Sequence, residues 1–164
     1  MGELIAPAFA ILVVVGLLAN ASLTVVQPYE SIVIFRLGKA TPESVRGPGL
    51  HFVLPVVDRA VRVDRRETAT DGTVGGTSKD DIAVTADLRI IWRVIDPFKS
   101  VLNVANAEEA LKDVAGSALE DLEADDAIAY AGRAADAIEA RLKDVGKRWG
   151  IEIAEVRVRR VSRA

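Results

Sequence analysis

The side chains that could perform hydrolysis are few in this chain and lie far apart in sequence. His51 is the single histidine, and it stands between Leu50 and Phe52. A general base needs a nucleophile and an orienting acid within hydrogen-bond reach, and no serine near His51 in sequence lies in a strand-to-helix turn. The pairs Ser78–Lys79 and Lys99–Ser100 are adjacent residues, which seldom point at each other on a strand. We therefore expect no catalytic residue. A membrane-bound, serine-protease-like hydrolase is the alternative.

Metal, cofactor and nucleic-acid sites are also not expected. The chain has no cysteine, which excludes disulfides and thiolate zinc sites, and one histidine cannot build a multi-histidine centre. The glycine-rich run Asp71–Ser78 lacks the spacing of a phosphate-binding loop, and Lys79 follows it in the wrong register. The net charge of −3 argues against nucleic-acid binding, which requires a dominant basic face.

The element that would position the rest of the chain is an N-terminal membrane anchor. No charged residue occurs between Glu3 and Glu30, and the apolar run from Leu4 to about Leu23 has the roughly 20 residues that a spanning helix needs. We assign residues 1–26 to this anchor. Its most apolar side chains are Leu4, Ile5, Ile11, Leu12, Val13, Val14, Val15, Leu17 and Leu18.

A cleaved signal peptide is the alternative to the anchor, because Ala19–Ala21 resembles a cleavage site. Cleavage would leave a soluble binding module. The acidic start of the chain argues against it, since signal peptides begin with positive charge. Basic residues near the span occur only on its C-terminal side, at Arg36, Lys39 and Arg46. The positive-inside rule then predicts a single-pass protein of the cell membrane whose body is cytoplasmic.

The body, residues 27–164, is predicted to be an α+β domain with an antiparallel sheet packed against helices. Alternating apolar residues predict strands at Ser31–Gly38, Arg59–Thr68 and Ile82–Asp96, with a hairpin connection at Asp71–Ser78. Helical periodicity follows over 107–124 and again from Ile128 to Gly150. A last strand covers Ile151–Val161, and its apolar phase slips between Ile153 and Val156, which indicates a bulge.

Two surfaces are predicted from the pattern of apolar and charged residues. The first is a membrane-surface patch, in which a shallow apolar loop dips into the bilayer and arginines meet anionic headgroups. Its residues are Arg46, Leu50, Phe52, Leu54, Arg59 and Arg62. The alternative is that the apolar run is a buried strand edge.

The second surface would join copies of the chain. Heptad-like spacing from Ile128 through Ala135 and Ile138 to Leu142 predicts an apolar seam, with ordinary packing of a helix on a sheet as the alternative. Charge is segregated as well: residues 105–126 hold eight acids and one base, and residues 133–164 hold nine bases and five acids. We expect Glu120 and Asp121 of one copy to attract Arg157 and Arg159 of the next.

Four segments of this chain together resemble the stomatin/prohibitin/flotillin superfamily, whose shared module is the SPFH or Band 7 domain. The segments are QPYESIVIFRLGK, RGPGLHFVLPVVDRAVRVDRRE, TSKDDIAVTADLRIIWRVIDPFKSV and WGIEIAEVRV. They are most similar to prokaryotic stomatin-like slipins, and with the anchor they cover nearly the whole chain. The resemblance implies a membrane-anchored scaffold, not an enzyme, that forms homo-oligomers and organises membrane microdomains. It implies as partners the anionic lipid bilayer and a membrane protease or a nodulation-efficiency-D-like membrane protein.

The chain departs from the slipin pattern at several points. Slipins usually carry a basic residue after WGI, where this chain has Glu152, and a threonine where it has Gly146. The helical region is unusually acidic. No long coiled coil follows the last predicted strand, so the chain is either a naturally short member of the superfamily or a truncated one. In either case we expect a looser assembly than longer relatives form.

Overall fold

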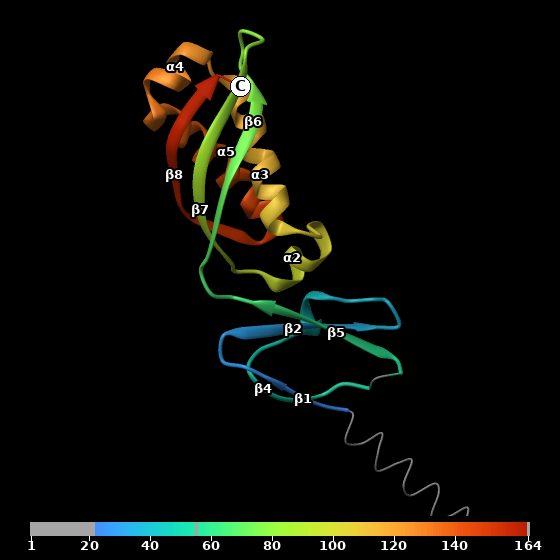
Figure 1. Cartoon of the computed structure of the whole chain (residues 1–164). Coiled ribbons are helices and arrows are strands. Elements are labelled where there is room, and N and C mark those ends of the chain that lie inside the picture. Colours follow the sequence, from blue (N-terminus) through green and yellow to red (C-terminus); the bar gives the residue numbers. More distant parts are fainter. Residues whose placement is uncertain (1–21, 55, 164) are drawn as a thin grey trace, which may run out of the picture. The chain divides into compact units, whose positions relative to one another are not determined.

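The computed structural model describes residues 22–54 and 56–163 (Figure 1). The predicted anchor side chains, Leu4 to Leu18, lie outside the described residues. The chain divides into two compact units, with the boundary between Asp64 and Arg65. Among the residues that the structure describes, no helix is both long enough and apolar enough to cross a bilayer.

The first unit consists of two small antiparallel sheets. Strands β1 (Leu23–Val26) and β4 (Gly49–Phe52) pair to form a ribbon. Strands β3 (Val45–Arg46), β2 (Glu30–Arg36) and β5 (Asp58–Asp64) form the second sheet, in the order β3-β2-β5. A short 3₁₀ turn, η2 (Pro42–Ser44), precedes β3. These strands are short, so their stability depends on packing between the layers rather than on the ladders alone.

A small apolar cluster joins the ribbon to the three-stranded sheet. Val26 and Val53 come from the ribbon side and Ile32 from β2, and all three are buried. Ile34 and Ala60 pack against them. Residues alternate between the two faces of a strand, so one face of the ribbon is committed to this cluster and the other face is directed away from it.

Strand β1 corrects the predicted boundary of the anchor at residue 26. Leu23 pairs with Phe52 and Val26 with Gly49, and the N–H of Val53 donates to the carbonyl of Ser22 at 2.7 Å. The first unit therefore begins at or before Ser22. Apolar composition alone does not separate the end of a spanning helix from a half-buried strand, which is why the prediction ran a few residues too far.

The second unit is built on a three-stranded antiparallel sheet. Its strands β6 (Thr68–Thr77), β7 (Ala83–Val94) and β8 (Ile151–Arg163) lie in the order β6-β7-β8. The apolar face predicted for the central strand is confirmed, since Val84, Ala86, Leu88, Ile90 and Val94 are buried. The predicted bulge is confirmed too: the register with β7 shifts so that Ala154, between Ile153 and Glu155, has no partner.

The glycine-rich run is a strand and not the predicted hairpin connection. It forms the C-terminal half of β6, and the chain turns only after it, around Asp81, whose φ is 58°. The glycines have a packing role: a Cβ on Gly76 would lie 2.5 Å from the carbonyl oxygen of Gly116. The sequence signal of a turn and that of a close helix–strand approach are the same, since both require glycine.

Five helical segments connect β7 to β8. They are α2 (Pro97–Asn103), α3 (Ala107–Ser117), the 3₁₀ turn η3 (Ala118–Asp121), α4 (Ala124–Ala129) and α5 (Ala131–Trp149). The side chains of Asp96 and Asn106 cap the N-termini of α2 and α3. Helix α5 ends as predicted at Gly150, whose φ of 71° is the left-handed conformation of a C-terminal cap.

Helices α3 and α5 cover one face of the sheet, and α3 lies along β6 (Figure 1). The core between them contains Leu111, Leu119, Ile138 and Leu142, each fully buried. The departure at Gly146 has a packing explanation, because a Cβ there would lie 2.7 Å from the carbonyl oxygen of Ile151. The predicted α+β class, with antiparallel sheets and helices, is confirmed.

Candidate functional site

The outward face of the β1–β4 ribbon is apolar and exposed. Leu23 faces Phe52 across the ribbon, and Val25 faces Leu50. Their exposed fractions are 53% and 60% for the first pair and 59% and 65% for the second. Cross-strand neighbours of this kind form one continuous surface. We call Leu23, Val25, Leu50 and Phe52 the apolar ribbon face.

The connection that follows β4 also exposes apolar side chains. Leu54 is 40% exposed and Val56 is 84% exposed, whereas Val53 between the ribbon and Leu54 is only 7% exposed. The sequence alternative of a buried strand edge is therefore wrong for Leu50, Phe52 and Leu54. Leu23 and Val25 were missed as members of the surface because they were assigned to the anchor. The alternation of Leu23, Thr24, Val25 was the available signal.

A buried carboxylate holds the connection after β4 in place. Asp58 receives two hydrogen bonds from Arg36, at 2.8 Å and 3.0 Å, and a third from the N–H of Leu54 at 3.2 Å. Its side chain is 1% exposed. The bonds from the guanidinium hold the pKa of Asp58 below its usual range, because they favour the charged carboxylate. The exposed Leu54 is thus tied through its backbone to the ends of β2 and β5.

The three arginines predicted for the same patch are not brought together. Ile32 of β2 pairs with Arg46 of β3 on one side and with Arg62 of β5 on the other. Paired residues point to the same face of a sheet, so both arginines lie on the face of the buried Ile32 side chain. Arg62 is paired with Glu30 at 3.3 Å. Arg59 is three residues from Arg62 on β5 and therefore points to the opposite face. Only Arg46 and Arg62 lie on the face that the ribbon covers.

The predicted apolar seam between copies is divided by the fold. Ile138 and Leu142 are fully buried inside the second unit, in the packing of α5 on the sheet, so they are not available to a second copy. This is the alternative that the spacing left open. Ala135 is half-buried, and Ile128 on α4 is 37% exposed.

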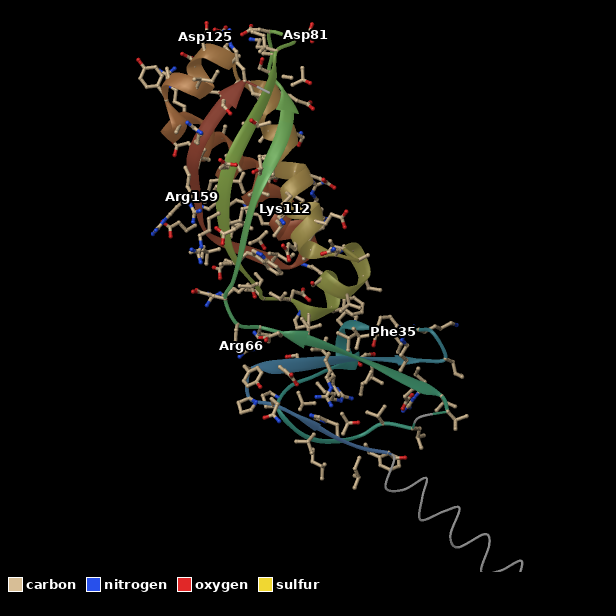
Figure 2. All side chains as sticks on the ribbon, in the orientation of Figure 1. Phe35, Arg66, Asp81, Lys112, Asp125 and Arg159 are labelled. Carbon is tan, nitrogen blue, oxygen red and sulfur yellow. The ribbon has the colours of Figure 1, made fainter. Side chains whose placement is uncertain are left out.

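The charged residues predicted to join copies are all at the surface. Glu120 and Asp121 lie on η3, and no ion pair of theirs occurs among the described residues. Arg157 is paired within its own strand with Glu155 at 2.5 Å, and Arg159 reaches Asp71 on β6 at 3.3 Å (Figure 2). The departure at Glu152 is compensated in the same way, because Glu152 pairs with Arg93.

Two of the candidate catalytic side chains, those of His51 and Ser78, form hydrogen bonds with the backbone. Nε2 of His51 lies 2.8 Å from the carbonyl oxygen of Gly47. The hydroxyl of Ser78 donates to the carbonyl of Ile82 and accepts from its N–H, which closes the turn after β6. Ser100 is buried in α2. Over residues 22–54 and 56–163, no group of three or more histidine and acidic side chains is arranged to hold a metal ion.

Comparison with known proteins agrees with the fold. The model of the SPFH domain / Band 7 family matches residues 24–163. The chain is 29% identical to a stomatin homologue of Pyrococcus horikoshii over 160 residues, 92% of this chain and 58% of that protein. It is 32% identical to stomatin-4 of Caenorhabditis elegans over 144 residues, 85% of this chain and 51% of that protein.

Mouse stomatin is similar as well, at 28% identity over 142 residues, 84% of this chain and 50% of that protein. The chain thus spans about half the length of the relatives it matches. The family match begins inside β1 and ends at the last residue of β8, so both units described above lie within it. The chain therefore belongs to the SPFH domain / Band 7 family.

Proposed function

We propose that this protein is a membrane-anchored scaffold that lays the apolar ribbon face against the bilayer and arranges neighbouring proteins by self-association. The observation that carries the proposal is the place of that face in the chain. The predicted span runs to about Leu23, and Leu23 is also the first residue of β1 and a member of the apolar ribbon face. A strand that directly follows a spanning helix starts at the membrane surface.

Membrane contact also explains the exposure of the ribbon. Burying apolar area contributes roughly 25 cal/mol per Å². Four large apolar side chains that remain in water do not make this contribution to folding, whereas contact with the bilayer would bury them. Large exposed apolar patches mark protein or membrane contacts. Arg46 and Arg62, on the sheet face that the ribbon covers, would meet anionic headgroups, each contributing about 1 kcal/mol near such a surface.

Self-association is the second part of the proposal. In this proposal the protein performs no chemistry and acts by holding copies of itself and neighbouring proteins together. Glu120 and Asp121, which have no ion pair within the described part of the chain, favour a head-to-tail contact with a basic surface of the next copy. Membership of the SPFH domain / Band 7 family supports a scaffold or regulator role in general. By the same resemblance we propose as partners a membrane protease or a nodulation-efficiency-D-like membrane protein.

Site-directed labelling tests the membrane contact directly, because the chain has no cysteine of its own. A single cysteine at Leu50 or at Phe52 carries a fluorophore, and the full-length protein is placed in nanodiscs that contain lipids brominated on the acyl chains. We expect strong quenching of both labels. The matched control is a cysteine at Arg59, which lies in the same unit on the opposite sheet face. If the Leu50 and Phe52 labels are quenched no more than the Arg59 label, the ribbon does not touch the bilayer.

The anchor is tested separately. Carbonate washing of membranes should leave the full-length chain in the pellet, since a spanning helix is not released by high pH. A mature N-terminus near Ser22, or release into the supernatant, would remove the anchor from the proposal and leave a module that binds the membrane only through its surface.

A further inference from the structure

The outer edge of β6 pairs with no other strand in residues 22–54 and 56–163, and the strand is regular along its whole length. Strand β6 is the outermost strand of its sheet, and it pairs with β7 through ten consecutive residues without a register shift. Natural proteins usually protect such edges with proline, lysine, bulges or covering elements. The segment Thr68–Thr77 contains no proline, lysine or arginine. The strand itself thus carries no proline, basic residue or bulge that would oppose pairing with another strand.

The opposite edge of the same sheet shows what protection looks like in this fold. Strand β8 carries two bulges, at Ala154 and at Arg159, where the register with β7 shifts. It also carries arginines at 157, 159, 160 and 163. Two edges of one sheet therefore differ in kind: β8 is interrupted and charged, whereas β6 is continuous and nearly neutral.

The phase of the β6–β7 ladder identifies the backbone groups at the open edge. The N–H of Ser78 donates to the carbonyl of Ile82 at 2.9 Å, directly after the last strand pair, Thr77 with Ala83. Hydrogen-bonded and non-hydrogen-bonded pairs alternate along an antiparallel ladder. The even-numbered residues of β6 thus bond to β7, and Asp71, Thr73 and Gly75 direct their N–H and C=O groups outward.

A groove runs beside these outward groups. It has a volume of about 440 Å³, and it lies between Thr73–Gly75 of β6 and one side of α3. Its α3 side presents Glu109 and Asp113, and Glu120 of η3 continues the line. At one end α3 closes the groove, since a Cβ on Gly116 would lie 2.6 Å from the carbonyl oxygen of Gly75.

The groove is acidic. Lys112 is its single basic lining residue, and its ammonium lies 3.0 Å from a carboxylate oxygen of Glu108, outside the lining (Figure 2). The Lys112 side chain is held against β6, with its Cε 3.0 Å from the position of a Cβ on Gly72. Neither Asp113 nor Glu120 has an ion pair among the residues that the structure describes. An incoming segment would therefore meet uncompensated negative charge.

We infer that β6 and α3 form a docking groove for an extended basic segment of a partner protein, which adds to the sheet as a fourth strand next to β6. Backbone bonds to Asp71 and Thr73 would supply affinity, as in other cases of strand addition, and alternate side chains would supply specificity. Lysine or arginine at every second position faces Glu109, Asp113 and Glu120. Strand β8 of a second copy fits less well, because its bulges break the ladder and it carries Glu152 and Glu155.

The test uses a fluorescent peptide of alternating lysine and threonine, about six residues long as a typical strand is. Binding to the full-length chain in nanodiscs without anionic lipid is followed by anisotropy, with empty nanodiscs as the blank. We expect binding that is lost in Thr73→Pro, which removes an outward N–H, and kept in Thr73→Ala, which removes the same side-chain hydroxyl. A peptide with a ¹³C-labelled carbonyl should show the infrared band of a β-strand when bound.

Charge reversal separates the groove from general electrostatics. Asp113→Lys should weaken binding roughly tenfold, as expected when an exposed attraction becomes a repulsion. The matched control Asp136→Lys makes the same charge change on an exposed residue of α5 outside the groove and should leave binding unchanged. Should Thr73→Pro fail to fold, the two lysine variants decide alone. None of these readings depends on membrane contact or self-association, so the scaffold proposal can fail while this one stands.

Two results would overturn the inference. One is equal binding to Thr73→Pro and Thr73→Ala, or equal weakening by the two lysine variants, because either excludes the edge as the site. The other is a fall in oligomer mass when Thr73→Pro is introduced without peptide, because the edge would then be covered by a second copy.

Discussion

Among single residues, Asp58 has the clearest structural role in the first unit. Its carboxylate accepts from Arg36 at the end of β2 and from the backbone of Leu54, and thereby ties the connection after β4 to a strand that is distant in sequence. A buried carboxylate without such partners would be costly. The arrangement of the exposed Leu54 therefore depends on a residue that itself lies away from the apolar ribbon face.

We predict that Asp58→Asn lowers the melting temperature of the protein and weakens quenching of a label at Leu54 by brominated lipids. The amide cannot accept both guanidinium bonds and the bond from Leu54, so the connection after β4 loosens. Differential scanning calorimetry and the labelling assay measure the two effects. Glu43→Gln, an exposed acid-to-amide change in the same unit, serves as control. Unchanged quenching in Asp58→Asn would show that the carboxylate does not position the loop.

The pH dependence of stability should follow from the same group. The pKa of Asp58 is lowered in the folded chain, so its stabilising contribution is fully present above the unfolded value of about 4 and is lost as pH falls through the folded value. Acid titration of the melting temperature should show a smaller decline in Asp58→Asn than in the wild type. Equal declines would assign the acid sensitivity to other carboxylates.

At the scale of secondary-structure elements, the most informative contact in the second unit is the one between β6 and α3. Gly76 and Gly116 allow the helix backbone to approach the strand backbone more closely than any side chain permits. This approach leaves the groove beside the strand edge and closes it at one end. The glycines therefore permit the close approach, and the buried Leu111 and Leu119 stabilise the packing of helix on sheet.

We expect Gly76→Ala to cost about 1–3 kcal/mol in the free energy of unfolding, because a methyl group there meets the backbone of Gly116 and forces overpacking. Gly75→Ala is the matched control on the next residue, where a Cβ meets nothing within 4 Å. Urea denaturation of both variants measures the difference. Similar costs at the two positions would show that the close approach is relaxed in solution.

Helix α5 gives a second prediction for elements. Ile138→Ala should cost about 2–5 kcal/mol, since the side chain is fully buried and its removal leaves a cavity. Ile128→Ala, at an exposed position, should change stability by no more than about 0.5 kcal/mol. Thermal unfolding distinguishes them. If Ile138→Ala keeps the stability of the wild type but no longer self-associates, Ile138 instead contacts a second copy.

The whole molecule combines a unit with an exposed apolar ribbon face and a unit that carries segregated charge. If the acidic surface around Glu120 and Asp121 attracts a basic surface of the next copy, assembly should weaken with salt. The screening length falls from about 10 Å at 0.1 M to about 3 Å at 1 M. We expect the mass of the protein in nanodiscs to fall over this range, as measured by mass photometry.

The double variant Glu120→Lys/Asp121→Lys should show low mass already at low salt, and Asp136→Lys, with one exposed acid reversed, should behave as the wild type. A monomer at micromolar concentration and low salt would contradict self-association. The protein would then act, at most, together with a partner that supplies the assembly.

The sequence by itself determined the class of fold and most of its elements. The alternation along β7, the cap at Gly150 and the bulge in β8 were all readable, because each depends on local periodicity or on one conformationally special residue. The family was readable from four segments of the chain, and the family match from residue 24 to 163 confirms it.

Tertiary structure alone decided three points. It placed the glycine run 71–78 in a strand, because a close helix approach and a turn demand the same residue. It buried Ile138 and Leu142 while leaving Leu50 and Phe52 in contact with solvent, since periodicity shows which residues share a face but not what covers that face. It also placed Arg46 on the same sheet face as Arg62, because both pair with Ile32, and such register is set by contacts between residues distant in the chain.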